Sequence, residues 1–280
     1  MRLPRETRCP MKHSISFRRI QISICVFVLS LAAVFALCRA APAQGGPVPP
    51  VGRNPSVPAT AASTTTPFIV VGFVGGFIKH DDIVHSEVQL AARLRQAYPS
   101  GVDVETFESY HGENAHKKIL VLLDTNHDGT LTPGEKQNAR IILYGHSWGA
   151  SEAITVAREL DNDGIPVLLT IQVDSVSKIH QNDAVIPANV ARAANFYETD
   201  GLVHGQTAIR AADPARTKII GNFRFDYKAS PYNCTEYPWY DRIFVKPHTQ
   251  IECDPNVWKK AEDLIRADLP PAASSGTMPK

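Results

Sequence analysis

A serine between two glycines is the first feature of the chain that could do chemistry. Residues 145–149 read GHSWG, and they lie between the apolar run 141–144 and a helical pattern that starts at Ala150. The two glycines allow a sharp turn from a strand into a helix, and such a turn pushes the serine hydroxyl out of the sheet. We therefore expect Ser147 to be a nucleophile; the other interpretation is a tight turn without chemistry.

Two further side chains suit a serine nucleophile, which needs a histidine to accept its proton and a carboxylate to orient that histidine. Asp174 follows an apolar run, and His248 lies in a predicted loop before the last helical pattern. Ser147, Asp174 and His248 therefore occur in the order nucleophile, acid, base, which is the order that this kind of turn requires. Asp200 is a competing candidate for the acid, and His204 competes for the base.

A second motif, DTNHDGTLTPGE at residues 124–135, has the spacing of an EF-hand calcium loop. Its oxygen-bearing side chains and its glycine stand where that loop places its ligands and its tight turn. The predicted ligands are Asp124, Asn126, Asp128, the backbone carbonyl of Thr130, and Glu135. We expect one structural calcium ion here; the alternative is a turn rich in Asp and Asn that binds no metal.

Apolar runs alternate with helical patterns from residue 67 onward, without a visible repeat. Runs typical of strands occupy 68–71, 102–107, 141–144, 167–173 and 194–197, and helical patterns cover about 81–98, 114–123, 150–160 and 256–267. Strands that are buried on both faces and followed by helices predict an α/β fold with a mostly parallel sheet. We expect one domain over residues 67–270, with the loop 124–135 as an insertion.

The N-terminal residues have the three-part layout of a secretory signal peptide. A basic segment precedes the apolar run 22–38 and the small residues 41–43. We expect 1–43 to be removed on export to a periplasmic or extracellular location; a retained membrane anchor is the alternative. Residues 44–66 are rich in Pro, Ser and Thr and predict a disordered linker, and 271–280 predict a disordered tail.

The net charge of +1 hides an asymmetry between the leader and the remaining chain. Residues 1–43 hold seven Lys or Arg and one acidic residue, which leaves 22 basic and 27 acidic residues in 44–280. A chain with a net charge of −5 lacks the excess of cations that neutralises phosphates. We therefore expect no nucleic-acid partner.

Two cysteines, Cys234 and Cys253, remain beyond the leader. An exported protein meets an oxidising compartment, where two cysteines most simply pair. We expect a disulfide that stabilises the fold by about 3 kcal/mol; two unpaired buried thiols are the alternative.

These motifs together resemble the α/β-hydrolase fold, and within it the secreted lipases and esterases. The resemblance extends from Phe68 to the last helical pattern. The segments that carry it are Gly72-Phe73, GHSWG at 145–149, VDSV at 173–176, His248-Thr249, Asp254-Pro255 and Trp258.

The resemblance implies roles for individual residues. The backbone amides of Trp148 and Phe73 would stabilise an oxyanion. In pancreatic-type lipases the acid follows the strand that comes after the nucleophile's helix. The position of Asp174 resembles that arrangement, which supports Asp174 as the acid. Most members of the fold place the acid one strand later, which keeps Asp200 open. Val71 stands where many lipases carry a histidine.

The sequence therefore predicts an exported serine hydrolase that cleaves carboxylic esters of small molecules or lipids through an acyl-enzyme. Esters rank above amides because the resembled proteins are mostly esterases and lipases. Two alternatives stay open: a calcium-stabilised, non-catalytic binding module on the same fold, and a serine peptidase. A retained leader would anchor the protein to a membrane.

Overall fold

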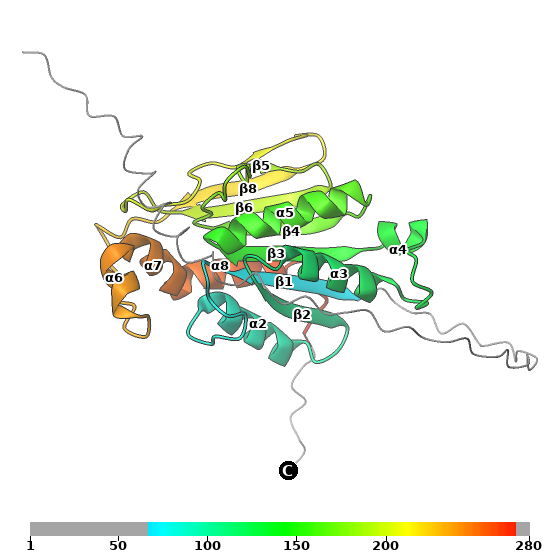
Figure 1. The fold of residues 1–280 in the computed structure, drawn as a ribbon, viewed down its shortest axis with the longest axis horizontal. Helices are drawn as coiled ribbons and strands as arrows, with labels where there is room; N and C mark the ends of the chain where they lie inside the picture. The colour runs from blue at the N-terminus through cyan, green and yellow to red at the C-terminus, as the bar shows by residue number, and fades with distance from the viewer. Residues whose placement is uncertain (1–66, 273–280) are drawn as a thin grey trace, which may run out of the picture. The chain divides into compact units, whose positions relative to one another are not determined.

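Six parallel strands form the central sheet of the protein (Figure 1). A computed structural model describes residues 67–272, which belong to one compact unit. From one edge to the other the strands are β2 (Val102–Glu108), β1 (Phe68–Val74), β3 (Arg140–His146), β4 (Val167–Val173), β6 (Val190–Tyr197) and β8 (Lys218–Arg224). Every neighbouring pair in this sheet is parallel. The predicted fold class, a mostly parallel sheet flanked by helices, is confirmed.

Helices cover both faces of the sheet (Figure 1). The four long ones are α2 (Ser86–Ala97) and α8 (Pro255–Arg266) on one face, and α3 (Gly112–Leu123) and α5 (Trp148–Asn162) on the other. Neighbouring residues of β1 point to opposite faces, as strand geometry requires. Val70 lies in the apolar core with Leu94 and Trp258. Val71 lies in the other core with Ile119 and Ile154.

The remaining elements are short. They are the helices α4 (Pro133–Gln137), α6 (Trp239–Phe244) and α7 (Lys246–Cys253), and the two-residue strands β5 (Val185–Ile186) and β7 (Arg210–Ala211), which pair with each other. In Figure 1, α6 and α7 lie at the end of the sheet where α5 begins.

The structure differs from the sequence expectation mainly after β4. Strand β6 begins at Val190 and not at Ala194, and neither β8 nor the helices α6 and α7 were predicted. Strand β8 is an edge strand whose residues are all exposed or half-buried, so it lacks the buried apolar run of a central strand. His248 lies in α7 and not in a loop, and α2 starts at Ser86, later than the predicted start at Asp81.

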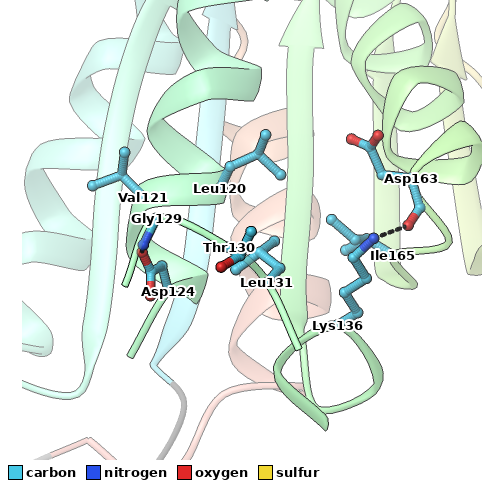
Figure 2. Close-up of a pocket in the computed structure, with 9 residues that line it drawn as sticks. All are labelled: Leu120, Val121, Asp124, Gly129, Thr130, Leu131, Lys136, Asp163 and Ile165. Atoms are coloured by element: carbon cyan, nitrogen blue, oxygen red, sulfur yellow. Dashed lines mark hydrogen bonds between the residues drawn. The ribbon is translucent and has the colours of Figure 1, made fainter. Parts of the chain in front are cut away.

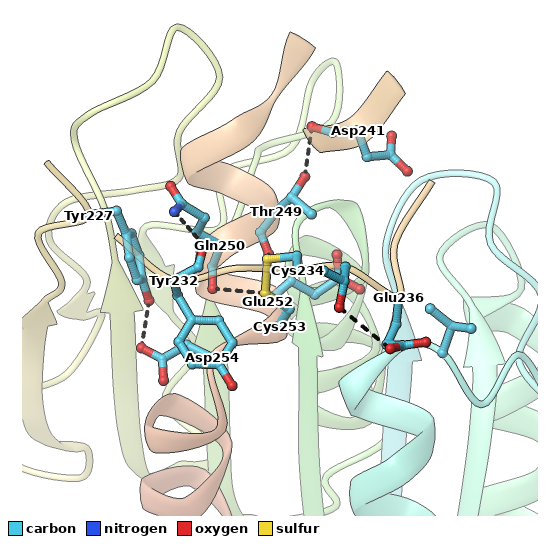
Figure 3. Close-up of a disulfide and its surroundings, with 12 residues drawn as sticks. Tyr227, Tyr232, Cys234, Glu236, Asp241, Thr249, Gln250, Glu252, Cys253 and Asp254 are labelled. Carbon is cyan, nitrogen blue, oxygen red and sulfur yellow. Dashed lines mark hydrogen bonds between the residues drawn. A yellow bond between two sulfur atoms is a disulfide. The ribbon is translucent and has the colours of Figure 1, made fainter. Parts of the chain in front are cut away.

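The predicted disulfide between Cys234 and Cys253 is present, with Cα atoms 5.8 Å apart (Figure 3). It joins the segment before α6 to the last residue of α7. The Thr249 hydroxyl donates to the backbone carbonyl of Asp241 at 3.1 Å. The side-chain amide of Gln250 donates to the backbone carbonyl of Tyr232 at 2.6 Å. Several long-range contacts therefore hold α7 in place.

The predicted signal peptide 1–43, the linker 44–66 and most of the predicted tail, residues 273–280, lie outside the described residues. Within 67–272, no helix has the length and apolar character needed to cross a membrane.

Candidate active site

Ser147 lies at the turn between β3 and α5 with a backbone conformation that few residues other than glycine adopt. Its φ is 55° and its ψ is −125°. A Cβ atom on Gly145 would lie 2.6 Å from the carbonyl carbon of Gly149, and one on Gly149 would lie 2.3 Å from the carbonyl oxygen of Phe73. Close packing therefore requires both glycines, and the turn that they permit holds the serine in a strained conformation.

Backbone hydrogen bonds join Ser147 to the segment that follows β4. The Ser147 amide donates to the Val173 carbonyl at 3.0 Å, and the Ser147 carbonyl accepts from the Val176 amide at 3.3 Å. Since Val173 directly precedes Asp174, the serine and the acid candidate both follow the carboxyl ends of adjacent parallel strands. We call this end of the strands the active-site edge of the sheet.

Asp174 and His248 lie in direct contact. His248 Nδ1 is 2.6 Å from Asp174 Oδ2, and both side chains are buried. The other carboxylate oxygen accepts hydrogen bonds from the amides of Gly205 at 2.8 Å and Glu198 at 3.2 Å. Burial alone would lower the pKa of His248, but the hydrogen bond and the charge of Asp174 outweigh it, so the pKa is raised above 6.5. Asp174 thus stabilises the protonated form of this histidine.

The competing candidates face other groups. Asp200 Oδ2 accepts from the amides of Tyr227 at 2.8 Å and Lys228 at 3.3 Å, so it orders the chain after β8. His204 Nδ1 is 3.1 Å from the carbonyl of the next residue, Gly205. Only Asp174 among the candidate acids contacts His248 in the described part of the chain. No hydrogen bond joins the Ser147 hydroxyl to His248 within these residues; such bonds often form only with bound substrate.

The two predicted oxyanion donors are placed differently. Trp148 is the first residue of α5, and the first intrahelical bond runs from Ser151 to the Ser147 carbonyl, so the Trp148 amide has no intrahelical acceptor. Phe73 lies inside β1, in register with Gly145 and two positions short of Ser147. Phe73 therefore precedes the end of the strand, and its amide stays a predicted oxyanion donor. Gly75, in the loop after β1, lies near the serine, because an added Cβ there would lie 3.2 Å from the Ser147 Cβ.

Aromatic side chains adjoin the start of α5. The Phe77 and Trp148 rings pack edge to face with centroids 5.6 Å apart, and the Tyr110 ring lies 6.4 Å from that of Phe77. Phe77 is 71% exposed and Tyr110 is 54% exposed. These rings form an apolar surface next to the nucleophile candidate.

Four buried titratable side chains belong to the GHSWG turn or lie near it: His146 of the turn itself, and His85, Glu87 and Glu252. The His146 ring lies against the His248 ring, with centroids 4.5 Å apart, and burial lowers the pKa of His146 to about 4. Burial raises the pKa of Glu87 well above its ordinary value, and the charge of Glu252 adds to this effect. None of the four was predicted as a site residue, because they come together from α2, β3 and α7 and share no local motif.

The loop 124–135 connects α3 to α4, and the Asp124 carboxylate accepts from the amides of Asp128 at 3.2 Å and Gly129 at 2.9 Å. Hydrogen bonds from Thr132 and Thr125 lower the pKa of Glu135 to about 2. The carboxylates of Asp124, Asp128 and Glu135 do not gather within 4.8 Å of one another in the described chain.

A pocket separates this loop from the end of α5 (Figure 2). Asp124, Gly129 and Leu131 line it on the loop side. On the other side the Lys136 ammonium donates to the Asp163 carbonyl at 2.9 Å. This bond joins α4, which follows the loop, to the C-terminal end of α5.

No protein-family model and no curated protein sequence matches this chain. Among solved structures, a cutinase-like protein from Cryptococcus sp. is 12% identical over 75% of this chain and 98% of that one, with a TM-score of 0.37. RedJ, a thioesterase from the prodiginine pathway of Streptomyces coelicolor, is 12% identical over 78% and 98%, with a TM-score of 0.33. A thermostable esterase from Pseudomonas putida is 11% identical over 72% and 74%, with a TM-score of 0.37. At such values the similarity does not bear on substrate or mechanism.

Proposed function

We propose that the protein is a serine hydrolase that cleaves carboxylic esters. The observation that carries the proposal is the contact of 2.6 Å between Asp174 and His248, at the sheet edge where Ser147 is held in a strained turn. An acid that orients a histidine which can take the proton of a serine hydroxyl is the arrangement that converts the hydroxyl into a nucleophile.

The chemistry follows from the tautomer of His248. Because Nδ1 faces Asp174, the free nitrogen Nε2 is the one available to Ser147. Ser147 Oγ would attack the ester carbonyl while Nε2 takes the hydroxyl proton. That proton would then pass to the leaving alcohol as the C–O bond breaks and the acyl-enzyme forms. Water would then lose a proton to Nε2 and attack the acyl carbon. That proton would pass to Ser147 Oγ as the bond between Oγ and the acyl carbon breaks, which releases the acid and restores the hydroxyl.

The oxyanion of each tetrahedral intermediate would receive hydrogen bonds from backbone amides at the start of α5 and in the loop after β1. The Trp148 amide belongs to a helix N-terminus, where backbone dipoles favour negative charge. The Gly75-Gly76 turn lies next to Ser147. The Ser109 hydroxyl donates a hydrogen bond of 2.8 Å to the Gly76 carbonyl and so fixes this turn. Removal of one such donor typically costs about 10²–10³ in kcat.

The substrate would be a small-molecule or lipid ester with an apolar group. The exposed rings of Phe77 and Tyr110, together with Trp148, provide an apolar surface next to Ser147. An exported enzyme would meet such substrates outside the cytoplasm, and the disulfide is compatible with that location.

We also propose one structural calcium ion in the loop 124–135. The donor set is that of an EF-hand loop, and the backbone already turns at Gly129, whose φ is 82°. The loop lies between α3 and the short helix before β3, so the ion would stabilise the entry of the strand that leads to Ser147.

The proposed hydrolysis is tested by turnover of nitrophenyl esters of increasing acyl length. Ser147→Ala should lower kcat by about 10⁶ without changing the melting temperature, while the matched variant Ser230→Ala, at an exposed position, should behave as the wild type. Retention of a tenth or more of the activity in Ser147→Ala would contradict the proposal. Absence of wild-type turnover on all esters would favour the binding module.

A further inference from the structure

A second cluster of reactive side chains lies beneath the active-site turn and takes no part in the proposed hydrolysis. His85 and Glu87 stand at the start of α2, and Glu252 stands on α7, one turn after His248. All three are buried, with exposures of 4%, 0% and 7% respectively. Groups of this kind are rarely buried together unless something compensates their charge.

Their donor atoms converge. One ligand atom from each of His85, Glu87 and Glu252 lies within 4.8 Å of the other two. His85 Nδ1 is 2.5 Å from Glu252 Oε1. His146 borders the cluster, with Nδ1 3.4 Å from Glu252 Oε2 and 3.8 Å from Glu87 Oε1.

Glu87 is the member whose charge the protein compensates least. Neither of its carboxylate oxygens has a hydrogen-bond partner among the described residues, although the side chain is completely buried. A buried carboxylate without a partner destabilises the fold when charged, and a protonated one still lacks an acceptor for its proton. His85 cannot serve both carboxylates, because its Nδ1 already faces Glu252.

We propose that His85, Glu87 and Glu252 bind one divalent transition-metal ion, with zinc the preferred ion. A divalent charge would balance both carboxylates and give Glu87 a partner. One imidazole and two carboxylates match the ligands of zinc, whereas calcium and magnesium prefer six or more oxygen atoms. Zinc bonds of about 2.0–2.2 Å place tetrahedral ligand atoms about 3.4 Å apart. The contact between His85 and Glu252 would therefore widen by about 1 Å on binding.

The position of the site gives it a structural role beneath the turn. A Cβ on Gly75 would lie 3.2 Å from His146 Nδ1, and the His146 ring lies against that of His248. An ion held by α2 and α7 would fix the position of the His146 side chain. That side chain packs between the loop after β1 and α7, the helix that carries the proposed base. In this assignment the ion does not contact the substrate, and it acts on the active site through His146, whose ring lies against that of His248.

Metal content of the purified protein tests the proposal independently of hydrolysis. After equilibrium dialysis against zinc at constant calcium, we expect one zinc per chain by mass spectrometry. Glu87→Gln and Glu252→Gln should weaken zinc binding on the order of 100-fold or more. Glu159→Gln, which changes a partly buried glutamate of α5, should bind as the wild type, and so should Glu135→Gln, which removes a predicted calcium ligand.

A second measurement does not depend on the variants folding. In the wild type, zinc should raise the melting temperature at constant calcium, and cobalt should give visible absorption bands of a four-coordinate or five-coordinate site. No bound zinc and no change in melting temperature would overturn the proposal. Zinc binding that is equal in the wild type, Glu87→Gln and Glu252→Gln would place the ion elsewhere and overturn it as well.

Discussion

The active-site edge of the sheet and the loop 124–135 both use acidic side chains, but they hold them in different ways. Asp174 accepts from His248, Gly205 and Glu198, which are 74, 31 and 24 residues away in the chain. The hydrogen bonds of Asp124 and Glu135 stay within the loop. Asp174 is thus fixed by the whole fold before any ligand binds, whereas the loop is shaped locally and its carboxylates still lie apart.

This difference predicts that changes at the sheet edge alter turnover and that changes in the loop alter stability. The largest effect is expected at Asp174. Asp174→Asn should lower kcat by about 10⁴, because the amide no longer holds His248 in the tautomer that accepts the serine proton. Asp200→Asn should leave turnover within a few-fold of the wild type, since Asp200 contacts Tyr227 and Lys228 and not the histidine. A larger loss in Asp200→Asn than in Asp174→Asn would reverse the assignment of the acid.

Loss of the disulfide should have the next largest effect, because the bridge stabilises the fold and also holds α7, the helix that carries His248. Reduction of the bridge between Cys234 and Cys253 should lower the free energy of unfolding by about 3 kcal/mol, and turnover should fall with it because α7 carries His248. Melting curves and ester turnover with and without reductant measure both effects. A double variant, Cys234→Ala with Cys253→Ala, should be insensitive to reductant. Equal melting of the oxidised and reduced wild type would show that α7 does not depend on the bridge.

Calcium should act on stability alone. An ion that binds only the folded state adds about 2.7 kcal/mol at a concentration 100 times Kd. The melting temperature of the wild type should therefore rise with calcium, and that of Glu135→Gln should not. Glu113→Gln, an exposed change on α3, should respond as the wild type does. Identical melting curves in calcium and in a calcium-selective chelator would show that the loop binds no ion.

The pH dependence should give the smallest effect. Catalysis requires neutral His248, so kcat/KM should rise with pH through the raised pKa of this residue, with its midpoint above 6.5. In Asp174→Asn the residual activity should have its midpoint at lower pH, because the charge that stabilises the imidazolium is gone. A midpoint that does not move between the two proteins would show that Asp174 does not set this pKa.

The sequence predicted the parts of the molecule that depend on local pattern or chain order. The apolar runs of β1, β3 and β4 predicted a buried parallel sheet because those strands are covered on both faces. The two cysteines predicted their bridge because only two remain beyond the leader. The edge strand β8 was missed because none of its residues is fully buried and three of the seven are exposed.

In the active-site region, too, only features that depend on local pattern or chain order could be predicted. The order of Ser147, Asp174 and His248 could be predicted, and the structure brings the last two into contact. The second oxyanion donor stays a prediction, because a sequence does not show where a strand ends relative to its neighbour, and β1 continues past Phe73 to Val74. The cluster of His85, Glu87 and Glu252 leaves no local signal, since its members come from the start of α2 and from α7, which are far apart in the chain.

The central claim, that Ser147 is an activated nucleophile, is tested most directly by a fluorophosphonate probe followed by peptide mapping. The phosphonyl group should be found on Ser147 in the wild type. Labelling should be slowed by about 10³ or more in His248→Ala, because the serine then has no base, and should remain rapid in His204→Ala. Rapid labelling of another residue, or equal labelling of Ser147 in the wild type and in His248→Ala, would contradict the claim.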